Sequence, residues 1–170
     1  AVANDHPIGP ANQYLASDLP QTEYDPDKAA FYMKKSGLGN VTVDLSVAEA
    51  AFTGAADAGA LYQNTAGPAG ININIVQEPN DGYWSNVWLR KPWCACYWSG
   101  RATEDWMFST AYETGVPWND TAWENARFQE LLLQGRAELD TAKRRDIYTE
   151  MQMIMSEEGG TIVPMYANYV

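Results

Sequence analysis

Residues 41 to 75 read VTVDLSVAEAAFTGAADAGALYQNTAGPAGININI, and this stretch decides the fold. Apolar residues alternate with polar or small ones at both of its ends, which is the pattern of half-buried strands. The alternating positions are Val41, Val43, Leu45 and Val47 in the first run and Ile71, Ile73 and Ile75 in the second. The alanine-rich residues 49–64 between the two runs predict a helix. Strand, helix and strand in this order predict a β-α-β unit with parallel strands and a right-handed connection.

A second unit of the same kind follows directly. Residues 81–89 predict a helix with Tyr83 and Trp84 in its first turn, and residues 94–98 predict a third strand. These two elements extend the predicted parallel sheet by one strand.

Two longer helices are predicted in the C-terminal third of the chain. Thr121 and Glu124 form a capping box, in which both side chains satisfy the first backbone N–H groups of a helix. Asp140 or Thr141 caps the second helix, whose apolar residues recur at helical spacing. Residues 161–166 then predict a short edge strand, since they include a proline, which cannot donate a hydrogen bond to a neighbouring strand.

The residues before the first predicted strand predict an extended segment followed by a short helix. Residues 1–24 are interrupted by prolines and predict an extended lead-in. Asp25 then provides a helix cap, Pro26 suits the first helical position and Gly37 stops the helix, so a short helix should run from Pro26 to Ser36. Together the assignments predict an α/β fold with an open, mostly parallel sheet and helices on both faces. They divide the chain into the lead-in and one compact α/β lobe, residues 25–170.

The charge balance excludes some classes of partner. The chain carries 11 basic and 22 acidic side chains, a formal charge of −11, so it lacks the basic face that nucleic acid requires. No apolar run approaches the roughly 18 residues that span a bilayer. The sequence begins without a methionine and without a signal-peptide pattern, so we expect that a leader was removed or lies upstream and that both ends are cut.

The residues that commonly carry metal or catalytic chemistry are few. His6 is the only histidine, and Cys94 and Cys96 are the only cysteines. Two strand residues in this spacing have Cα atoms about 6.5 to 7 Å apart, at the limit for a disulfide, so we interpret the cysteines as small buried side chains. Neither a phosphate-binding loop nor a nucleophile motif is present. We therefore expect no metal, no cofactor and no enzymatic activity.

The candidate site follows from the predicted sheet. In an open α/β sheet, ligands gather beyond the carboxyl ends of the strands. The third strand places Tyr97 and Trp98 at its end and Arg101 shortly after them. An arginine can hold a carboxylate through two parallel hydrogen bonds, which indicates a site for an anionic group beside an aromatic surface. The alternative is that Arg101 forms a surface ion pair. The three loops at these strand ends are residues 48–49, 81–84 and 98–105.

Seven segments carry a resemblance to a known family. In order, they are YDPDKAA (24–30), GINI (70–73), YWSG (97–100), WNDT (118–121), FQELL (128–132), DTAKRRDIY (140–148) and IVPMY (162–166). Read together, they resemble the C-terminal part of the family 5 extracellular solute-binding proteins, which include peptide, nickel and opine receptors of ABC importers. The resemblance implies one lobe of a periplasmic binding protein type II-like fold. It also implies a periplasmic location, an ABC permease as partner, and an N-terminal lobe of the same protein that is absent here.

The resemblance also concerns the ligand. In peptide-binding members an aspartate shortly after the Trp-x-Gly turn holds the peptide's amino terminus, and Arg101 stands at the matching position. Because this position departs from the family pattern, our hypothesis is that Arg101 receives an anionic group of the solute, such as the carboxylate of an opine or a sugar acid. Glu104 or Asp105 would be the partner of an amine. The predicted ligand-binding residues are Arg101, Trp98, Tyr97, Ser99, Tyr83, Trp84, Glu104 and Asp105.

Two other classes of function are left open by the sequence. One is a small α/β hydrolase in which His6 would act as the base. The other is a protein-interaction domain that uses exposed tryptophans as its contact patch.

Overall fold

The structure is a computed structural model that describes residues 1–167. The chain forms two compact units, which we call the sheet unit (residues 23–98) and the helical unit (residues 1–22 and 99–170). This division differs from the predicted lead-in of residues 1–24 and lobe of residues 25–170, whose last three residues lie outside the described part.

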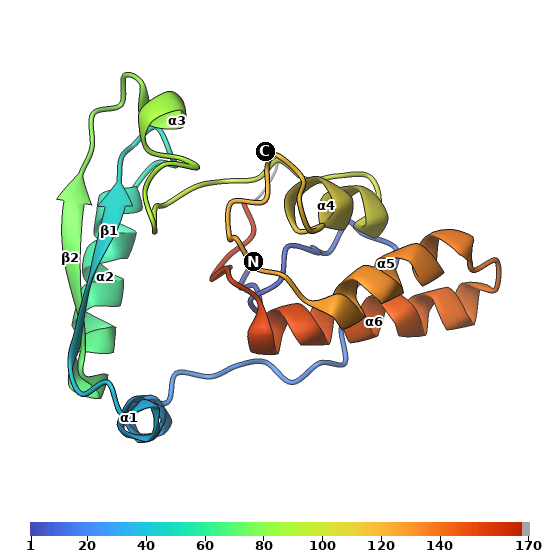
Figure 1. The fold of residues 1–170 in the computed structure, drawn as a ribbon, viewed down its shortest axis with the longest axis horizontal. Coiled ribbons are helices and arrows are strands. Elements are labelled where there is room, and N and C mark those ends of the chain that lie inside the picture. Colours follow the sequence, from blue (N-terminus) through green and yellow to red (C-terminus); the bar gives the residue numbers. More distant parts are fainter. Residues whose placement is uncertain (168–170) are drawn as a thin grey trace. The chain divides into compact units, whose positions relative to one another are not determined.

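The sheet unit is built on the predicted β-α-β arrangement. Strands β1 (Val41–Val47) and β2 (Ile71–Gln77) pair in parallel, and helix α2 (Ala55–Ala66) lies along one face of the pair (Figure 1). Gly59 of α2 allows the close approach, since a Cβ there would lie 3.1 Å from Ile75 Cδ1. A short 3-10 helix, η1 (Gly67–Ala69), joins α2 to β2.

The two faces of the sheet differ in polarity. Leu45, Val47 and Ile73 are buried in the core that forms beneath α2. The alternate residues point to the other face, where Asn74 donates a hydrogen bond of 2.8 Å to the exposed Asp44 across the strands. The α/β fold class is confirmed, although the sheet of the described residues is small and α2 covers only one of its faces.

Helix α1 (Pro26–Ser36) has the predicted bounds. The side chain of Asp25 accepts a hydrogen bond of 2.8 Å from the backbone N–H of Lys28, which caps the helix. Gly37 ends it with φ of 74°, a conformation that glycine adopts without strain.

The predicted third strand is wrong. Residues 94–98 form a single parallel bridge, between Ser46 and Cys94, and no ladder beyond it. The carbonyl of Ala95 instead accepts a hydrogen bond of 2.7 Å from the hydroxyl of Tyr83, so a side chain takes the place of a neighbouring strand.

The helix predicted at residues 81–89 is shorter than expected. Helix α3 spans only Tyr83–Asn86. Gly82 precedes it with φ of 74° and Leu89 follows it with φ of 59°, and neither conformation continues a right-handed helix.

The helical unit contains α4 (Glu104–Ala111), α5 (Ala126–Ala137) and α6 (Thr141–Glu158), with α5 and α6 antiparallel and in contact (Figure 1). Asp140, one of the two predicted caps, caps α6, and Gly159 ends it. Helix α4, capped by the side chain of Thr103, was not predicted.

The predicted capping box is wrong. Helix α5 begins after Asn125, whose side chain accepts a hydrogen bond of 2.9 Å from the N–H of Phe128. Thr121 instead donates its hydroxyl hydrogen to the side chain of Asn119, and Ala122 has φ of 52°, so the chain is still in a turn there.

The first residues are packed rather than extended. Ile8 and Tyr14 are buried, and the fully buried Gln152 of α6 donates to the carbonyl of Tyr14 and accepts from the N–H of Ala16.

The predicted last strand is limited to one antiparallel bridge, between Val2 and Met165. In the described part of the chain, no helix combines the length and apolarity that crossing a membrane would require.

Candidate functional site

Four of the predicted ligand-binding residues lie in the sheet unit and form an aromatic cluster with Trp88. Trp84 of α3 makes edge-to-face contacts with Tyr83, Trp88 and Tyr97, at centroid distances of 5.6, 6.1 and 5.3 Å. Trp88 contacts Trp98 in the same way at 6.0 Å. Trp84 and Tyr97 are 39% and 59% exposed, so the cluster presents ring surface to solvent. We call the five rings of Tyr83, Trp84, Trp88, Tyr97 and Trp98 the aromatic cluster.

Tyr83 anchors this cluster to the sheet. Its hydroxyl donates to the backbone carbonyl of Ala95 and lies 3.2 Å from the carbonyl of Ser46. Burial, together with the neighbouring thiols of Cys94 and Cys96, raises the pKa of this hydroxyl above its ordinary value, so Tyr83 stays a hydrogen-bond donor. A fixed aromatic anchor gives the exposed rings a defined position.

The other predicted ligand-binding residues lie in the helical unit. The half-buried Arg101 donates a hydrogen bond of 2.7 Å from Nη1 to the carbonyl of Ser99, and its guanidinium lies 5.5 Å from the centre of the Trp106 ring. Asn12 donates to the backbone carbonyl of Arg101 at 3.1 Å. These contacts place Arg101 on an aromatic ring and fix the backbone that carries it.

Glu104 and Asp105 have partners within the chain. Glu104 is 3% exposed and accepts a hydrogen bond of 2.7 Å from the N–H of Tyr14. Asp105 forms an ion pair of 2.6 Å with Arg136. Both carboxylates therefore hold the helical unit together in this structure.

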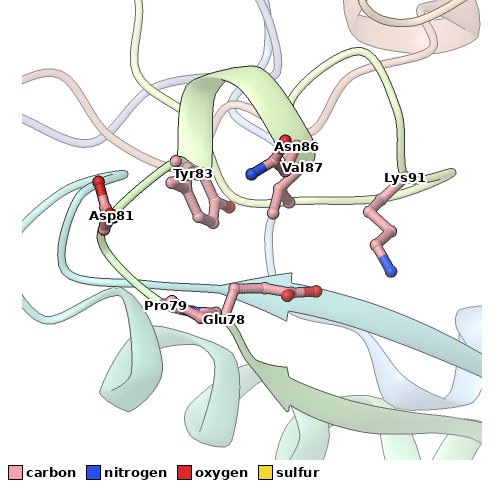
Figure 2. Close-up of a pocket in the computed structure, with 8 residues that line it drawn as sticks. Glu78, Pro79, Asp81, Tyr83, Asn86, Val87 and Lys91 are labelled. Atoms are coloured by element: carbon pink, nitrogen blue, oxygen red, sulfur yellow. The ribbon is translucent and has the colours of Figure 1, made fainter.

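A pocket of about 300 Å³ opens at the carboxyl end of β2 (Figure 2). Its lining includes residues of the loop 81–84, one of the three loops expected at the carboxyl ends of the strands. Tyr83 contributes to both this pocket and the aromatic cluster. Sequence reasoning did not single out Glu78, Asn86 or Lys91, which also line the pocket, although Glu78 directly follows β2. The complete lining consists of Glu78, Pro79, Asp81, Gly82, Tyr83, Asn86, Val87 and Lys91.

The residues considered for metal or catalytic chemistry occupy other environments. No group of three or more His, Cys, Asp or Glu residues suited to a metal ion occurs within residues 1–167. His6, the proposed base of a hydrolase, is 2% exposed, and its Nδ1 lies 3.3 Å from the hydroxyl of Tyr166. Such a histidine is shielded from any substrate in solution. Cys94 and Cys96 are half-buried thiols and form no disulfide.

Comparison with solved structures identifies the fold. The chain is similar to the periplasmic binding protein DppA from Helicobacter pylori in complex with the peptide STSA, with a TM-score of 0.76 and 18% identity over 89% of this chain and 31% of that chain. HbpA2 from Haemophilus parasuis matches with a TM-score of 0.78 and 20% identity, over 96% of this chain and 34% of that chain. AgaA from A. tumefaciens in complex with agropinic acid matches with a TM-score of 0.75 and 17% identity, over 92% of this chain and 33% of that chain.

The chain spans about a third of the length of these structures. No protein-family model and no curated protein sequence matches it significantly. At identities this low, similarity establishes the fold and leaves the ligand to be argued from the site. The chain has the fold of one lobe of a periplasmic binding protein.

Proposed function

We propose that this chain is the C-terminal, ligand-facing lobe of a family 5 solute-binding protein, the receptor that captures a solute for an ABC importer. The fold is the observation that carries the proposal, because each of the three structures matches at least 89% of this chain and so includes both units. The family resemblance of seven sequence segments supports it independently of the fold comparison. The complete protein would then add an N-terminal lobe, work in the periplasm and deliver its solute to a membrane permease.

The aromatic cluster is the proposed contact for the apolar part of the solute. Trp84 and Tyr97 expose ring surface while Tyr83 is buried and fixed to the backbone. Rigid aromatic rings with exposed faces lose little conformational entropy when they bind, so they contribute strongly to affinity. A receptor that closes on its solute can use such a surface in one lobe.

Arg101 is the proposed contact for an anionic group of the solute. Its guanidinium is oriented by the ring of Trp106, and an oriented guanidinium suits the planar geometry of a carboxylate. Glu104 and Asp105 are left out of the proposed ligand contacts, because their carboxylates already hold Tyr14 and Arg136. An opine, a sugar acid or a peptide with an acidic group would satisfy this arrangement.

The test is to identify the solute and then to measure its affinity. Mass spectrometry of the small molecules that copurify with the complete protein should find a carboxylate-bearing solute. Replacing Arg101 with alanine should weaken binding of that solute by about 2 kcal/mol or more in calorimetry, as for other buried charge contacts. Arg90, which is exposed, is the matched control, and Arg90→Ala should leave the affinity unchanged. Equal affinity of the wild type and the Arg101→Ala variant would overturn the role of Arg101.

A further inference from the structure

The pocket at the end of β2 combines an apolar lining with charged groups of both signs. Tyr83 and Val87 are buried and form its apolar part, while Glu78, Asp81 and Lys91 contribute the charges (Figure 2). Its volume of about 300 Å³ is at the lower end of the range for small-molecule sites. It can therefore hold one small polar group of a larger solute.

The polar side chains of this pocket are little used by the protein itself. Glu78 accepts one hydrogen bond, of 2.8 Å, from the hydroxyl of Ser46 through Oε1. Among the described residues 1–167, the side chains of Asp81, Asn86 and Lys91 have no hydrogen-bond or ion-pair partner. Lys91 in particular pairs with neither carboxylate. These groups are consequently available to a ligand.

The combination of charges narrows the chemistry of that ligand. The two carboxylates, those of Glu78 and Asp81, favour an ammonium group. A ligand with only a positive charge would be repelled by the ammonium of Lys91, and a ligand with only a negative charge would be repelled by Glu78 and Asp81. A group that carries an ammonium and a carboxylate on one carbon atom satisfies both signs at once, and the amide of Asn86 can donate a hydrogen bond to its carboxylate.

We infer that this pocket binds an α-amino-acid group, with the ammonium toward Glu78 and Asp81 and the carboxylate toward Lys91 and Asn86. The inference rests on the proposed function in one respect, because it assigns the group to the solute of a receptor. Since Tyr83 belongs to both the pocket and the aromatic cluster, the remainder of the solute would extend along Trp84. The solute class is then an amino-acid conjugate with an unmodified α-amino-acid end.

Three probes of nearly equal shape test the inference on the chain as it stands. L-alanine carries both charges, isopropylammonium carries only the positive one, and isobutyrate carries only the negative one. Each is titrated into the isotopically labelled chain while NMR shifts of the Asn86 side-chain amide and of backbone residues 82–87 are followed. We expect saturable shifts with L-alanine and at least about fivefold weaker binding of either half-probe, since each loses one charge-assisted contact.

Single substitutions then assign the two charges. Asp81→Asn should weaken L-alanine and isopropylammonium, whereas Lys91→Gln should weaken L-alanine and isobutyrate. Arg90→Gln removes a neighbouring positive charge outside the pocket lining and should change none of the three titrations. Tightest binding of isobutyrate or of isopropylammonium would overturn the inference. The absence of any saturable shift up to about 100 mM L-alanine, which means a binding free energy weaker than about 1.4 kcal/mol, would also overturn it.

The outcome separates this inference from the proposed function. If the complete protein retains a solute that lacks an α-amino-acid group, the pocket assignment fails and the receptor function stands. If the pocket binds L-alanine but the complete protein retains and binds no solute, the receptor function fails and the pocket assignment stands.

Discussion

The backbone N–H of Tyr14 donates a hydrogen bond of 2.7 Å to Oε1 of Glu104, a residue 90 positions further along the chain. Glu104 is the first residue of α4 and is almost fully buried. Its carboxylate thus lies at the positive end of a helix and also fixes the N-terminal segment, two interactions that favour an acidic side chain at this position. This contact explains why the prolines of residues 1–22 do not leave that segment extended.

Replacing Glu104 with alanine should lower the free energy of unfolding by about 2 kcal/mol, because the substitution leaves the buried N–H of Tyr14 without its charged acceptor. Glu104→Gln keeps an acceptor oxygen and should cost less. Chemical denaturation followed by circular dichroism measures both. Glu124, which is exposed, provides the control, and Glu124→Ala should change stability by less than about 0.5 kcal/mol. A Glu104→Ala variant as stable as the wild type would contradict the structural role.

A side chain at Gly59 should destabilise the protein more than a side chain at Gly67. A Cβ at Gly59 would meet Ile75 Cδ1 at 3.1 Å and Val47 Cγ1 at 3.3 Å, so in Gly59→Ala these core side chains, or α2 itself, must shift by a few tenths of an ångström. We expect a loss of about 1 to 3 kcal/mol in the free energy of unfolding. At Gly67, where φ is −51°, no atom outside the two chain neighbours lies within 4 Å of the position that a Cβ would occupy. Pro68 disfavours this helical conformation for a residue with a side chain before it, so Gly67→Ala should have a small cost, below that of Gly59→Ala. Equal effects of the two substitutions, measured by thermal unfolding, would show that α2 can shift freely.

His6 should make stability depend on pH. Burial lowers its pKa from the ordinary 6.5, so the unfolded chain binds a proton at a pH where the folded chain does not. Stability conferred by neutral His6 is therefore present above pH 6.5 and is lost as the pH falls from 6.5 toward the lower folded-state pKa. Asp5, whose pKa burial raises, acts in the opposite direction at lower pH, because its protonated form is favoured in the folded state.

The measurement is denaturation at a series of pH values from about 7.5 to about 5.5, on both sides of the ordinary histidine pKa of 6.5. The wild type should lose stability across this range. His6→Gln keeps a polar side chain without a titratable ring and should have a flatter profile. Parallel profiles for the two proteins would show that His6 does not control this dependence.

Local signals in the sequence predicted the elements that depend on local contacts. The bounds of α1 follow from the cap at Asp25 and the left-handed Gly37, both of which act within one turn of the helix. Strands β1 and β2 follow from apolar alternation, because one face of the sheet is buried. The predicted third strand is wrong for a reason outside its own residues: the hydroxyl of Tyr83 takes the carbonyl of Ala95.

The candidate site shows the same distinction. Tyr83, Trp84, Tyr97 and Trp98 could be named from the sequence, and the structure brings their rings together through Trp88. The pocket lining beside them could not be named as a set. Asn86 and Lys91 become neighbours of Glu78 only because Gly82 and the single turn of α3 fold the chain back over the end of β2, and a four-residue helix leaves no periodic signal.

Trp84 should be the central ring of the aromatic cluster, and Tyr97 a peripheral one. Trp84 contacts the rings of Tyr83, Trp88 and Tyr97, whereas the ring contact described for Tyr97 is the one with Trp84, at 5.3 Å and 86°. Each edge-to-face contact contributes about 0.5 to 1.5 kcal/mol beyond the buried area. Trp84→Ala should therefore lower the free energy of unfolding more than Tyr97→Ala does, even without any solute.

A double-mutant cycle isolates the contact between these two rings. The free energies of unfolding of the wild type, Trp84→Ala, Tyr97→Ala and the double variant should reveal a coupling of about 0.5 to 1.5 kcal/mol. Pairing Trp84→Ala with Leu133→Ala gives the control, because Leu133 is an exposed residue of the helical unit and should show no coupling. Additive effects of Trp84 and Tyr97 would mean that the rings are not held edge to face. Their contact would then not contribute to the free energy of unfolding without solute, and these two rings could not act as a preformed binding surface.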